Sequence, residues 1–274
     1  MIPGCNQKQG DERSTSYVFD NASAEAAHRF RALEAIFDPG SKRLLVELGV
    51  KPGWSCLEAG AGSGSIAAWL SERVGHEGRV LATDIDTRHL RHLRFGNLTV
   101  QDHDLRHAPL PEGCFDLVHM RLVLIHLPNR EQVLQRLASA LKPGGLLVVE
   151  DFDSLSLRPD PEVNPAESAP ATLEARLRVM TDRGVELRCG RLLEGWFRRL
   201  GLVDVGNEGR VFMWRGGSPG ADHMRANIEQ LRTEILASGL VSASQLQQDL
   251  AALSRQEFAF PSPIMWAAWG RRLL

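Results

Sequence analysis

Three glycines spaced two residues apart, Gly60, Gly62 and Gly64, follow directly on an apolar segment of the chain. Glycines let a backbone turn sharply and approach a ligand closely, and the helix predicted after them offers amide donors at its first turn. The spacing departs from the GxGxxG motif of dinucleotide-binding proteins, because position 65 is serine. Glu58, two residues before the loop, would lie poorly beside a pyrophosphate. These residues therefore favour a ligand that carries a cationic amine.

Two further acidic residues stand at the ends of the next two predicted strands. Asp84 ends the second strand, where a carboxylate can accept hydrogen bonds from both hydroxyls of a ribose. Asp104 follows the third strand, where it can accept a hydrogen bond from an adenine amine while the backbone of Leu105 donates. Each acid alone would more often be a solvated loop charge, and a lone glycine cluster is often only a flexible loop. Because the three acids follow successive strands, together they indicate a nucleoside-binding site.

Short apolar segments alternate with helical patterns around this loop. The alternation predicts a doubly wound α/β layer, in which helices cover both faces of a mostly parallel sheet and ligands lie at the carboxyl ends of its strands. Ahead of the first strand, helical spacing predicts two helices, 23–37 and 41–48, divided by Asp38-Pro39-Gly40. The predicted strands of the core are 55–59, 79–84, 97–101, 114–120 and 146–150, and the predicted helices are 65–74, 87–95 and 130–141.

Beyond residue 151 the regular alternation ends. Four prolines mark the segment 155–170 as a loop. A strand is predicted at 203–214 and a last strand at 263–270, and the helical segments between these two strands are interpreted as an insertion. The predicted helices of this half are 172–183, 191–200, 221–237 and 242–255.

The composition disfavours several classes of protein. Lys and Arg total 32 and Asp and Glu total 34, giving a formal net charge of −2, so no global charge attracts nucleic acid or an anionic membrane. The cysteines form no CxxC pair, so neither a disulfide framework nor a zinc site is predicted. No apolar run is long enough to span a membrane, and the N-terminus lacks the apolar stretch of a signal peptide. The expected location is therefore the cytoplasm.

The stretch 55–151 resembles the class I S-adenosylmethionine-dependent methyltransferases, in particular the branch that acts on small molecules. The matching segments are LEAGAGSGSIA, ATDID, HDLRHAPLPEGCFDLVHMRLVLIHL and LKPGGLLVVED, which occur in the expected order. The resemblance implies a seven-stranded Rossmann-like sheet whose last strand is antiparallel, with S-adenosyl-L-methionine as the cofactor.

The resemblance also implies roles for individual residues. Glu58 and the glycine loop would hold the methionine end of the cofactor, Asp84 the ribose and Asp104 the adenine. Apart from the resemblance, Arg121 is a candidate contact for the methionine carboxylate or for an acidic acceptor, with a surface arginine as the alternative interpretation. The predicted cofactor contacts are Tyr17, Glu58, Gly60, Ala61, Gly62, Gly64, Asp84, Ile85, Asp104, Leu105, His119 and Arg121.

Methyl transfer requires few catalytic groups, because the protein must mainly align the nucleophile, the methyl group and the sulfur, and exclude water. His119 is the candidate general base, with a pocket-lining role without proton transfer as its alternative. Tyr17, the one tyrosine of the chain, is the candidate lid residue over the cofactor, or else an aromatic anchor for the leader. His126 is expected to be structural. No metal site is predicted from the acids at 150–153.

The predicted function is transfer of a methyl group to an oxygen, nitrogen or carbon atom of a small metabolite, with specialised-metabolite biosynthesis as a candidate setting. No (D/N/S)PPY motif follows the fourth strand, which disfavours nucleic-acid bases and glutamine amides as acceptors. The alternative is a protein of the same fold that binds the cofactor in a regulatory or non-methylating role. A nicotinamide-dependent dehydrogenase is disfavoured, because a third pyrophosphate glycine and a YxxxK motif are both missing.

One domain with helical additions explains the length better than two independent domains. We expect a mobile leader over 1–16 and a single methyltransferase domain over 17–274. Within it, lid helices would occupy 17–50, the cofactor-binding core 51–151, and the acceptor-side helices with the last two strands 152–274. The oligomeric state stays open, a homodimer included.

Overall fold

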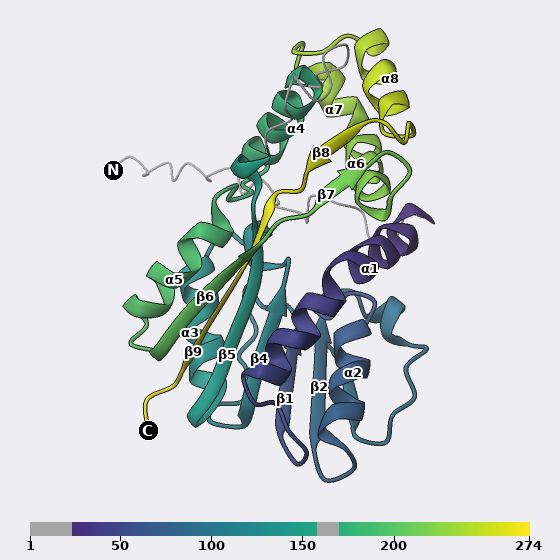
Figure 1. Cartoon of the computed structure of the whole chain (residues 1–274). Coiled ribbons are helices and arrows are strands. Elements are labelled where there is room, and N and C mark those ends of the chain that lie inside the picture. The colour runs from purple at the N-terminus through teal and green to yellow at the C-terminus, as the bar shows by residue number, and fades with distance from the viewer. Residues whose placement is uncertain (1–23, 158–169) are drawn as a thin grey trace, which may run out of the picture.

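A seven-stranded sheet forms the centre of the protein (Figure 1). The computed structural model describes residues 24–157 and 170–274, so the predicted leader, Tyr17 and most of the proline-rich loop lie outside the described residues. The strand order is β3-β2-β1-β4-β5-β9-β6. These strands are β1 (Ser55–Ala59), β2 (Arg79–Asp84), β3 (Leu98–Asp102), β4 (Phe115–Arg121), β5 (Leu141–Asp153), β6 (Val203–Arg210) and β9 (Ile264–Arg271).

The sheet is parallel from β3 to β5 and antiparallel beyond it. β9 pairs antiparallel with both β5 and β6, which confirms the expected mostly parallel sheet with an antiparallel last strand. The strand order reverses between β1 and β4, which pair with Glu58 opposite His119. In such sheets the crevice at the carboxyl ends of the strands beside this reversal is the usual place for a ligand.

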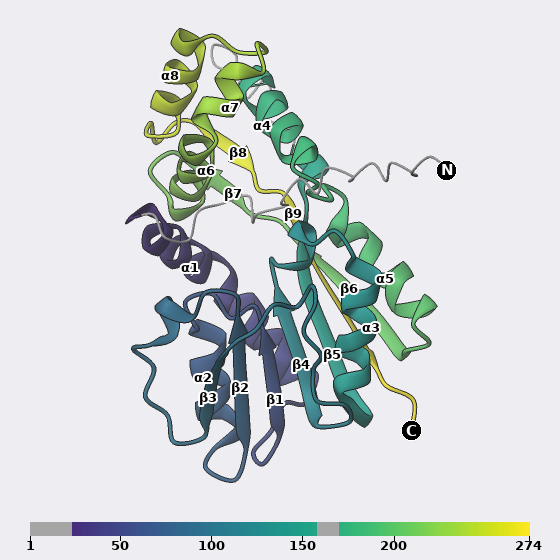
Figure 2. The same ribbon diagram turned by 180° about the vertical axis from the view of Figure 1, so that it is seen from behind.

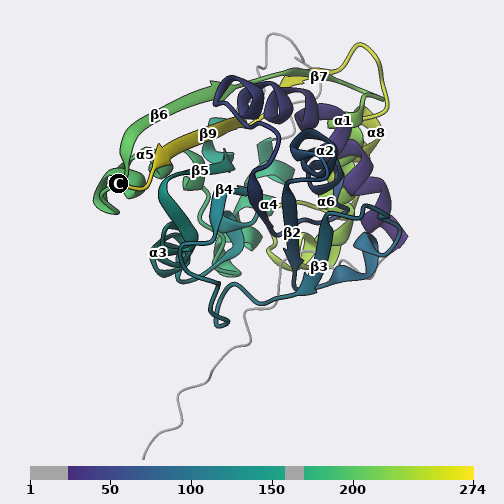
Figure 3. The same ribbon diagram turned by 90° about the horizontal axis from the view of Figure 1, so that it is seen from below.

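Helices cover both faces of the sheet (Figure 3). On one face lie α1 (Ala24–Glu47) and α2 (Ser65–Val74), and on the other lie α3 (Arg130–Ala140) and α5 (Cys189–Arg199). Successive residues of a strand point to opposite faces, so Leu117 belongs to the core under α2 whereas Val118 belongs to the core under α3. Both residues are fully buried, which is why the central strands are continuous apolar runs in the sequence.

The expected break between the two N-terminal helices is wrong. α1 is one helix that runs through Pro39, although proline removes an interior hydrogen bond. Phe37 before the proline and Leu45 after it are both fully buried, and the Ser41 hydroxyl donates to the Phe37 carbonyl at 3.1 Å. Burial of the helix on both sides of Pro39 therefore outweighs the local penalty.

Two other segments differ from the prediction. The expected helix 87–95 is only a 3-10 turn at Thr87–Leu90, in which Leu90 is the buried residue. The expected strand 203–214 divides into β6 and β7 (Met213–Arg215). β7 leaves the main sheet and pairs with β8 (Ala259–Pro261) in a two-stranded ribbon. The two residues between β6 and β7, Val211 and Phe212, are typical strand formers, so the sequence does not show the bend.

The remaining helices stand beyond the carboxyl ends of the central strands (Figure 2). Three of these helices lie between β6 and β9 in the sequence, and the two-stranded ribbon of β7 and β8 joins them to the main sheet. The two ends of this segment meet, because the Gly216 N–H donates to the Phe258 carbonyl at 2.8 Å. None of the helices described is long and apolar enough to cross a membrane. The helices of this upper layer are α4 (Pro170–Asp182), α6 (Pro219–Gln230), α7 (Arg232–Ala237) and α8 (Ala243–Ala252).

Candidate functional site

The glycine loop connects β1 to α2 at the reversal of the strand order. Gly60, Gly62 and Gly64 all have positive φ angles, of 77°, 58° and 89°. A methyl group at Gly60 would lie 2.3 Å from the Val123 side chain, so this position requires glycine for space as well as for conformation. The N–H groups of Gly60 and Ala61 both donate to the Thr83 carbonyl, at 2.8 and 2.9 Å. The loop is thereby fixed against the end of β2.

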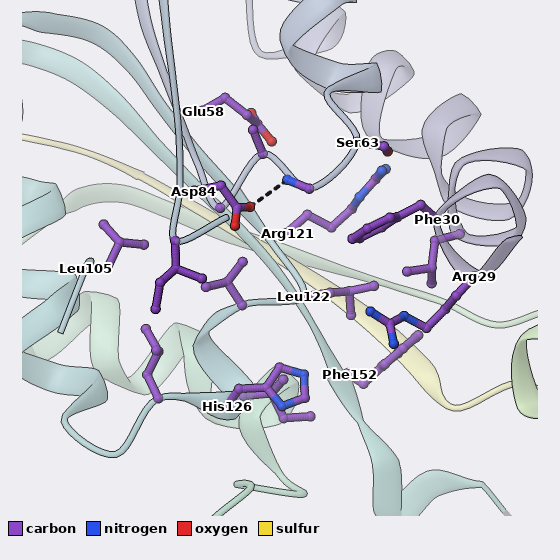
Figure 4. A pocket seen from close by; sticks show the side chains of 18 of the residues that line it. Arg29, Phe30, Glu58, Ser63, Asp84, Leu105, Arg121, Leu122, His126 and Phe152 are labelled. Atoms are coloured by element: carbon purple, nitrogen blue, oxygen red, sulfur yellow. Dashed lines mark hydrogen bonds between the residues drawn. The ribbon is translucent and has the colours of Figure 1, made fainter. Parts of the chain in front are cut away.

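Asp84 holds the other side of this loop (Figure 4). Its Oδ2 accepts a hydrogen bond from the Gly62 N–H at 2.8 Å, and its Oδ1 accepts from the Asp86 N–H at 3.0 Å. Burial raises the pKa of Asp84, while the N–H groups of Gly62 and Asp86 oppose that rise. The Ile85 N–H also donates to this carboxylate, which can accept about four hydrogen bonds in all and so keeps acceptor capacity for a hydroxyl donor. Ile85, the next residue, has 56% of its surface exposed, and it lines the same cavity.

Asp104 and Leu105 follow β3 and also reach the cavity. The Asp104 carboxylate is paired with the Arg106 guanidinium at 2.9 Å, and this hydrogen bond lowers the pKa of Asp104. The Leu105 carbonyl accepts a hydrogen bond from Arg136 at 2.6 Å. Sequence reasoning missed both arginines. They fix the backbone at this corner, and Arg106 shares the carboxylate that was expected to serve adenine alone.

The predicted contacts meet in one cavity at the carboxyl end of the sheet, with a volume of about 1500 Å³ when the open solvent at its mouth is counted. Figure 4 shows that Glu58 and Asp84 lie on one side, and that Arg29, His126 and Phe152 lie across from them. Among the predicted contacts with described side chains, the lining includes Glu58, Gly60, Ala61, Gly62, Asp84, Ile85, Asp104, Leu105 and Arg121. Gly64 is the residue that caps the start of α2. Tyr17 lies outside the described residues.

The structure does not place His119 where a general base would work. His119 lies within β4, has no exposed surface and is not part of the cavity lining. Its Nδ1 lies 2.6 Å from a Glu58 oxygen, and its Nε2 lies 3.0 Å from a Glu150 oxygen. The second Glu150 oxygen is paired with Arg210. Both ring nitrogens are therefore occupied by carboxylates inside the sheet.

The charges of His119 and of the carboxylates beside it follow from this geometry. Burial alone would lower the pKa of His119, but the Glu58 and Glu150 carboxylates outweigh it and raise the pKa to about 9. Burial would raise the pKa of Glu150, but the hydrogen bond from His119 and the charges of His119 and Arg210 lower it to about 2. His119 is thus a buried imidazolium at neutral pH, with no lone pair to accept a proton. The predicted role as catalytic base is corrected to a structural one.

Arg121 lines the cavity from the end of β4, but it is not a surface arginine. Its side chain is 11% exposed and pairs with Asp38 at 2.7 Å, and it also donates to the Ser41 hydroxyl at 2.9 Å. The pairing ties β4 to the middle of α1. Contact with the carboxylate of a cofactor stays a prediction.

The second half of the cavity was not anticipated residue by residue. His126, expected to be structural, lines it, and burial together with nearby arginines lowers its pKa to about 3. The signal in the sequence was an arginine at position 176 among the apolar residues of a helix, which standard core patterns do not contain. No group of three metal-ligating side chains occurs within 24–157 and 170–274. The unanticipated lining residues include Arg29, Phe152, Arg176, His223 and Asn227.

Comparisons with known proteins agree with this arrangement. The family model described as "Methyltransferase domain" matches residues 57–149. The protein "Methyltransferase str3" of Strobilurus tenacellus is 41% identical over 103 residues, which cover 36% of this chain and 35% of that protein. The ubiquinone/menaquinone biosynthesis C-methyltransferase UbiE of Laribacter hongkongensis is 35% identical over 113 residues, covering 39% of this chain and 46% of that protein. The match thus spans less than half the length of either relative.

Solved structures share the fold over most of the chain. The phosphoethanolamine N-methyltransferase 2 of Haemonchus contortus, in complex with phosphomonomethylethanolamine and S-adenosylhomocysteine, has a TM-score of 0.57 at 17% identity, covering 95% of this chain and 60% of that one. The YcgJ protein of Bacillus subtilis has a TM-score of 0.55 at 13% identity, covering 86% and 99%. At these identities the likeness concerns the fold alone. Residues 57–149 are thus similar to a methyltransferase domain, and the chain as a whole shares the fold of these solved structures.

Proposed function

We propose that this chain binds S-adenosyl-L-methionine and transfers its methyl group to an oxygen, nitrogen or carbon atom of a small molecule. The observation that carries the proposal is the single cavity shared by the glycine loop, the ends of β2 and β3, and a second chamber beneath α4 and α6. Transfer between two bound molecules requires two joined chambers, because the reacting atoms must be aligned and the site must exclude water.

The residues of the first chamber fit the cofactor. Asp84 has acceptor capacity for the ribose hydroxyls, and Ile85 presents an exposed apolar surface next to it. Gly60 and Gly62 line the cavity with backbone alone, and Glu58, whose charge is balanced by His119, lines it next to the loop. When bound, S-adenosylmethionine supplies an electrophilic methyl group on a positively charged sulfur. The acids of this chamber would stabilise that charge, and the fixed loop would orient it.

The chain's contribution to the chemistry is mainly alignment. The His119 imidazolium holds Glu58 in one position, and the Asp84 carboxylate holds the glycine loop. Neither Glu58 nor the loop therefore needs to move when the cofactor binds. Leu122 and Val123 form an apolar part of the lining next to the loop, where they would exclude water. Among the sequence relatives, the name of UbiE contains C-methyltransferase, so carbon is the first acceptor atom to test. A role in specialised-metabolite biosynthesis remains part of this proposal.

The alternative is a protein that binds the cofactor without transferring its methyl group. One observation favours it: the histidine expected beside the sulfur is buried between two carboxylates and unable to act as a base. Methyl transfer to an activated carbon or to a thiolate needs no base from the protein. The observation therefore agrees equally with a methyltransferase whose acceptor needs no base and with a protein that does not transfer the methyl group.

The experiment is to incubate the purified chain with methyl-labelled S-adenosylmethionine and a small-molecule extract, and to measure both S-adenosylhomocysteine release and label transfer by mass. Transfer that is lost in Asp84→Ala and kept in Asp182→Asn, a change at an exposed residue of α4, supports the proposal. Tight calorimetric binding of S-adenosylmethionine without transfer in any fraction supports the alternative. Absence of heat with both S-adenosylmethionine and S-adenosylhomocysteine would exclude both.

A further inference from the structure

The second chamber contains a buried arginine that has no countercharge among residues 24–157 and 170–274. Arg176 lies on α4, only 7% of its surface is exposed, and it lines the cavity. Its guanidinium makes no hydrogen bond or ion pair within the described part of the chain, and its Nε is buried without any partner. Burial lowers the pKa of Arg176 to about 10, and no acidic group in the described part of the chain counteracts this. The side chain is therefore still a cation at neutral pH.

Other polar groups, from two more helices, line the same cavity as this guanidinium. His223 and Asn227 stand one helical turn apart on the same face of α6, with Nε2 of the histidine 3.1 Å from Nδ2 of the asparagine. They are 6% and 3% exposed, and His223 Nδ1 and Asn227 Oδ1 are buried without partners. Arg29 of α1, 2% exposed, also lines this chamber and donates to Gln230 at 2.7 Å.

The charges of the cavity are therefore divided between its two halves. The acids that line it, Glu58, Asp84 and Asp104, follow the ends of β1, β2 and β3, on the side of the glycine loop. On the opposite side, the pKa of His223 is lowered to about 3 by burial and by the charges of Arg176 and Arg29, and no acid of the described residues raises it again. His223 is consequently neutral at pH 7, and the chamber keeps a net positive charge.

An uncompensated buried charge destabilises a protein, and replacing it by an apolar residue of similar volume is often neutral or stabilising. A guanidinium also presents a planar set of donors that matches the two oxygens of a carboxylate or the oxygens of a phosphate. A ligand that brings such a group would supply the missing countercharge. The remaining buried polar atoms of His223 and Asn227 lie where they could complete its hydrogen bonds.

We propose that the acceptor molecule carries an anionic oxygen group, a carboxylate or a phosphate, which Arg176 binds in the chamber beneath α4 and α6. Arg29 adds positive charge on the same side, and His223 and Asn227 add hydrogen bonds. This inference rests on the proposed function, because it assigns the second chamber to the acceptor. The anionic group serves as an anchor and takes no part in bond making, so Arg176 is a specificity-determining residue.

The test measures fragment binding to the full chain by calorimetry and ligand-observed NMR, with and without saturating S-adenosylhomocysteine. Benzoate and phenyl phosphate are the anionic probes, benzamide is the neutral probe of similar shape, and inorganic phosphate tests the anion alone. We expect each aromatic anion to bind at least about tenfold more tightly than benzamide, the ratio typical of one charged hydrogen bond. Stronger binding of benzoate or of phenyl phosphate identifies which anion the chamber prefers.

Arg176→Gln should abolish the preference for the anions and leave S-adenosylhomocysteine affinity unchanged. Arg178→Gln is the matched control, because this arginine stands on the same helix, is 69% exposed and pairs with Asp182. Arg176→Met should keep or raise the melting temperature of the ligand-free chain while it removes anion binding, and a structural arginine would show the opposite change.

Three results would overturn the inference. The first is equal binding of the anions and benzamide to the wild-type chain. The second is a preference that survives in Arg176→Gln. The third is weaker S-adenosylhomocysteine binding in that variant, which would assign the arginine to the cofactor's own carboxylate. If the wild-type chain binds no S-adenosylhomocysteine but still prefers the anions, the proposed function fails and the anion site stands.

Discussion

Replacing His119 by glutamine should destabilise the protein by removing the cation between two buried carboxylates. Glutamine retains hydrogen-bonding groups but cannot carry the charge that neutralises Glu58 and Glu150, which are 3% and 0% exposed. The rise in the pKa of His119 from 6.5 to about 9, at about 1.4 kcal/mol per tenfold change in proton affinity, corresponds to roughly 3 kcal/mol. Removal of one partner from a buried ion pair typically costs about 3–5 kcal/mol, which is the same range.

The pH dependence distinguishes this charge from ordinary packing. Because the pKa of His119 is raised in the folded state, its stabilisation is fully present below the unfolded value of 6.5 and is lost as the pH rises through about 9. Urea denaturation across this interval should therefore show a declining free energy of unfolding in the wild type. His119→Gln should start lower and stay nearly flat, so that the two curves approach each other at the alkaline end.

His92→Gln is the control, because this histidine is exposed on the surface. It should reproduce the wild-type curve. Turnover by the folded His119→Gln variant should stay within several-fold of the wild type, whereas loss of a general base typically reduces rates by about 100- to 10,000-fold. A variant with unchanged stability at pH 6.5 and a loss of that size would refute the structural role.

Three further outcomes are expected at the cofactor side. Asp84→Ala should weaken S-adenosylhomocysteine binding by about 10- to 150-fold in calorimetry, since a hydrogen bond to a charged group is worth about 1.5–3 kcal/mol, and unchanged affinity would contradict the assignment. Gly60→Ala combines a φ of 77° with a contact of 2.3 Å to Val123, so it should lose cofactor binding and about 1–3 kcal/mol of stability. Adding Val123→Ala should recover only part of that loss, and full recovery would argue against backbone strain. Exhaustive chelation should leave turnover unchanged, and activity restored specifically by a divalent ion would reverse the expectation that no metal is used.

The sequence predicted the central layer well, because its signals there are local. The bounds of β1, α2 and β2 agree with the predicted 55–59, 65–74 and 79–84. Each of these elements is bounded by a glycine turn or a charged residue, and the apolar runs reflect burial on both faces. At Pro39 the local signal predicted a helix break that the structure does not have, because packing between residues distant in sequence outweighs the effect of the proline.

The candidate site was predictable only on its cofactor side. Glycines and acids at strand ends have fixed places in the chain, so Gly60 and Asp84 could be found from spacing. The two carboxylate partners of His119 could not be found from spacing, because they come from the strands on either side of β4, namely β1 and β5. Sequence spacing carries no information on which strands are neighbours. The same holds for Arg176 and His223, which lie on two helices that only the folded chain brings to one cavity.

The hydrogen bond between Gly216 and Phe258 has a consequence for how such a protein can diversify. Everything from residue 216 to residue 258 begins and ends at one point on the ribbon, so its length and content can change without moving any strand of the main sheet. His223 and Asn227 lie within that exchangeable piece, whereas the glycine loop and Asp84 do not. A graft of the corresponding piece from a relative should accordingly alter which molecule is accepted and leave the affinity for the methyl donor intact.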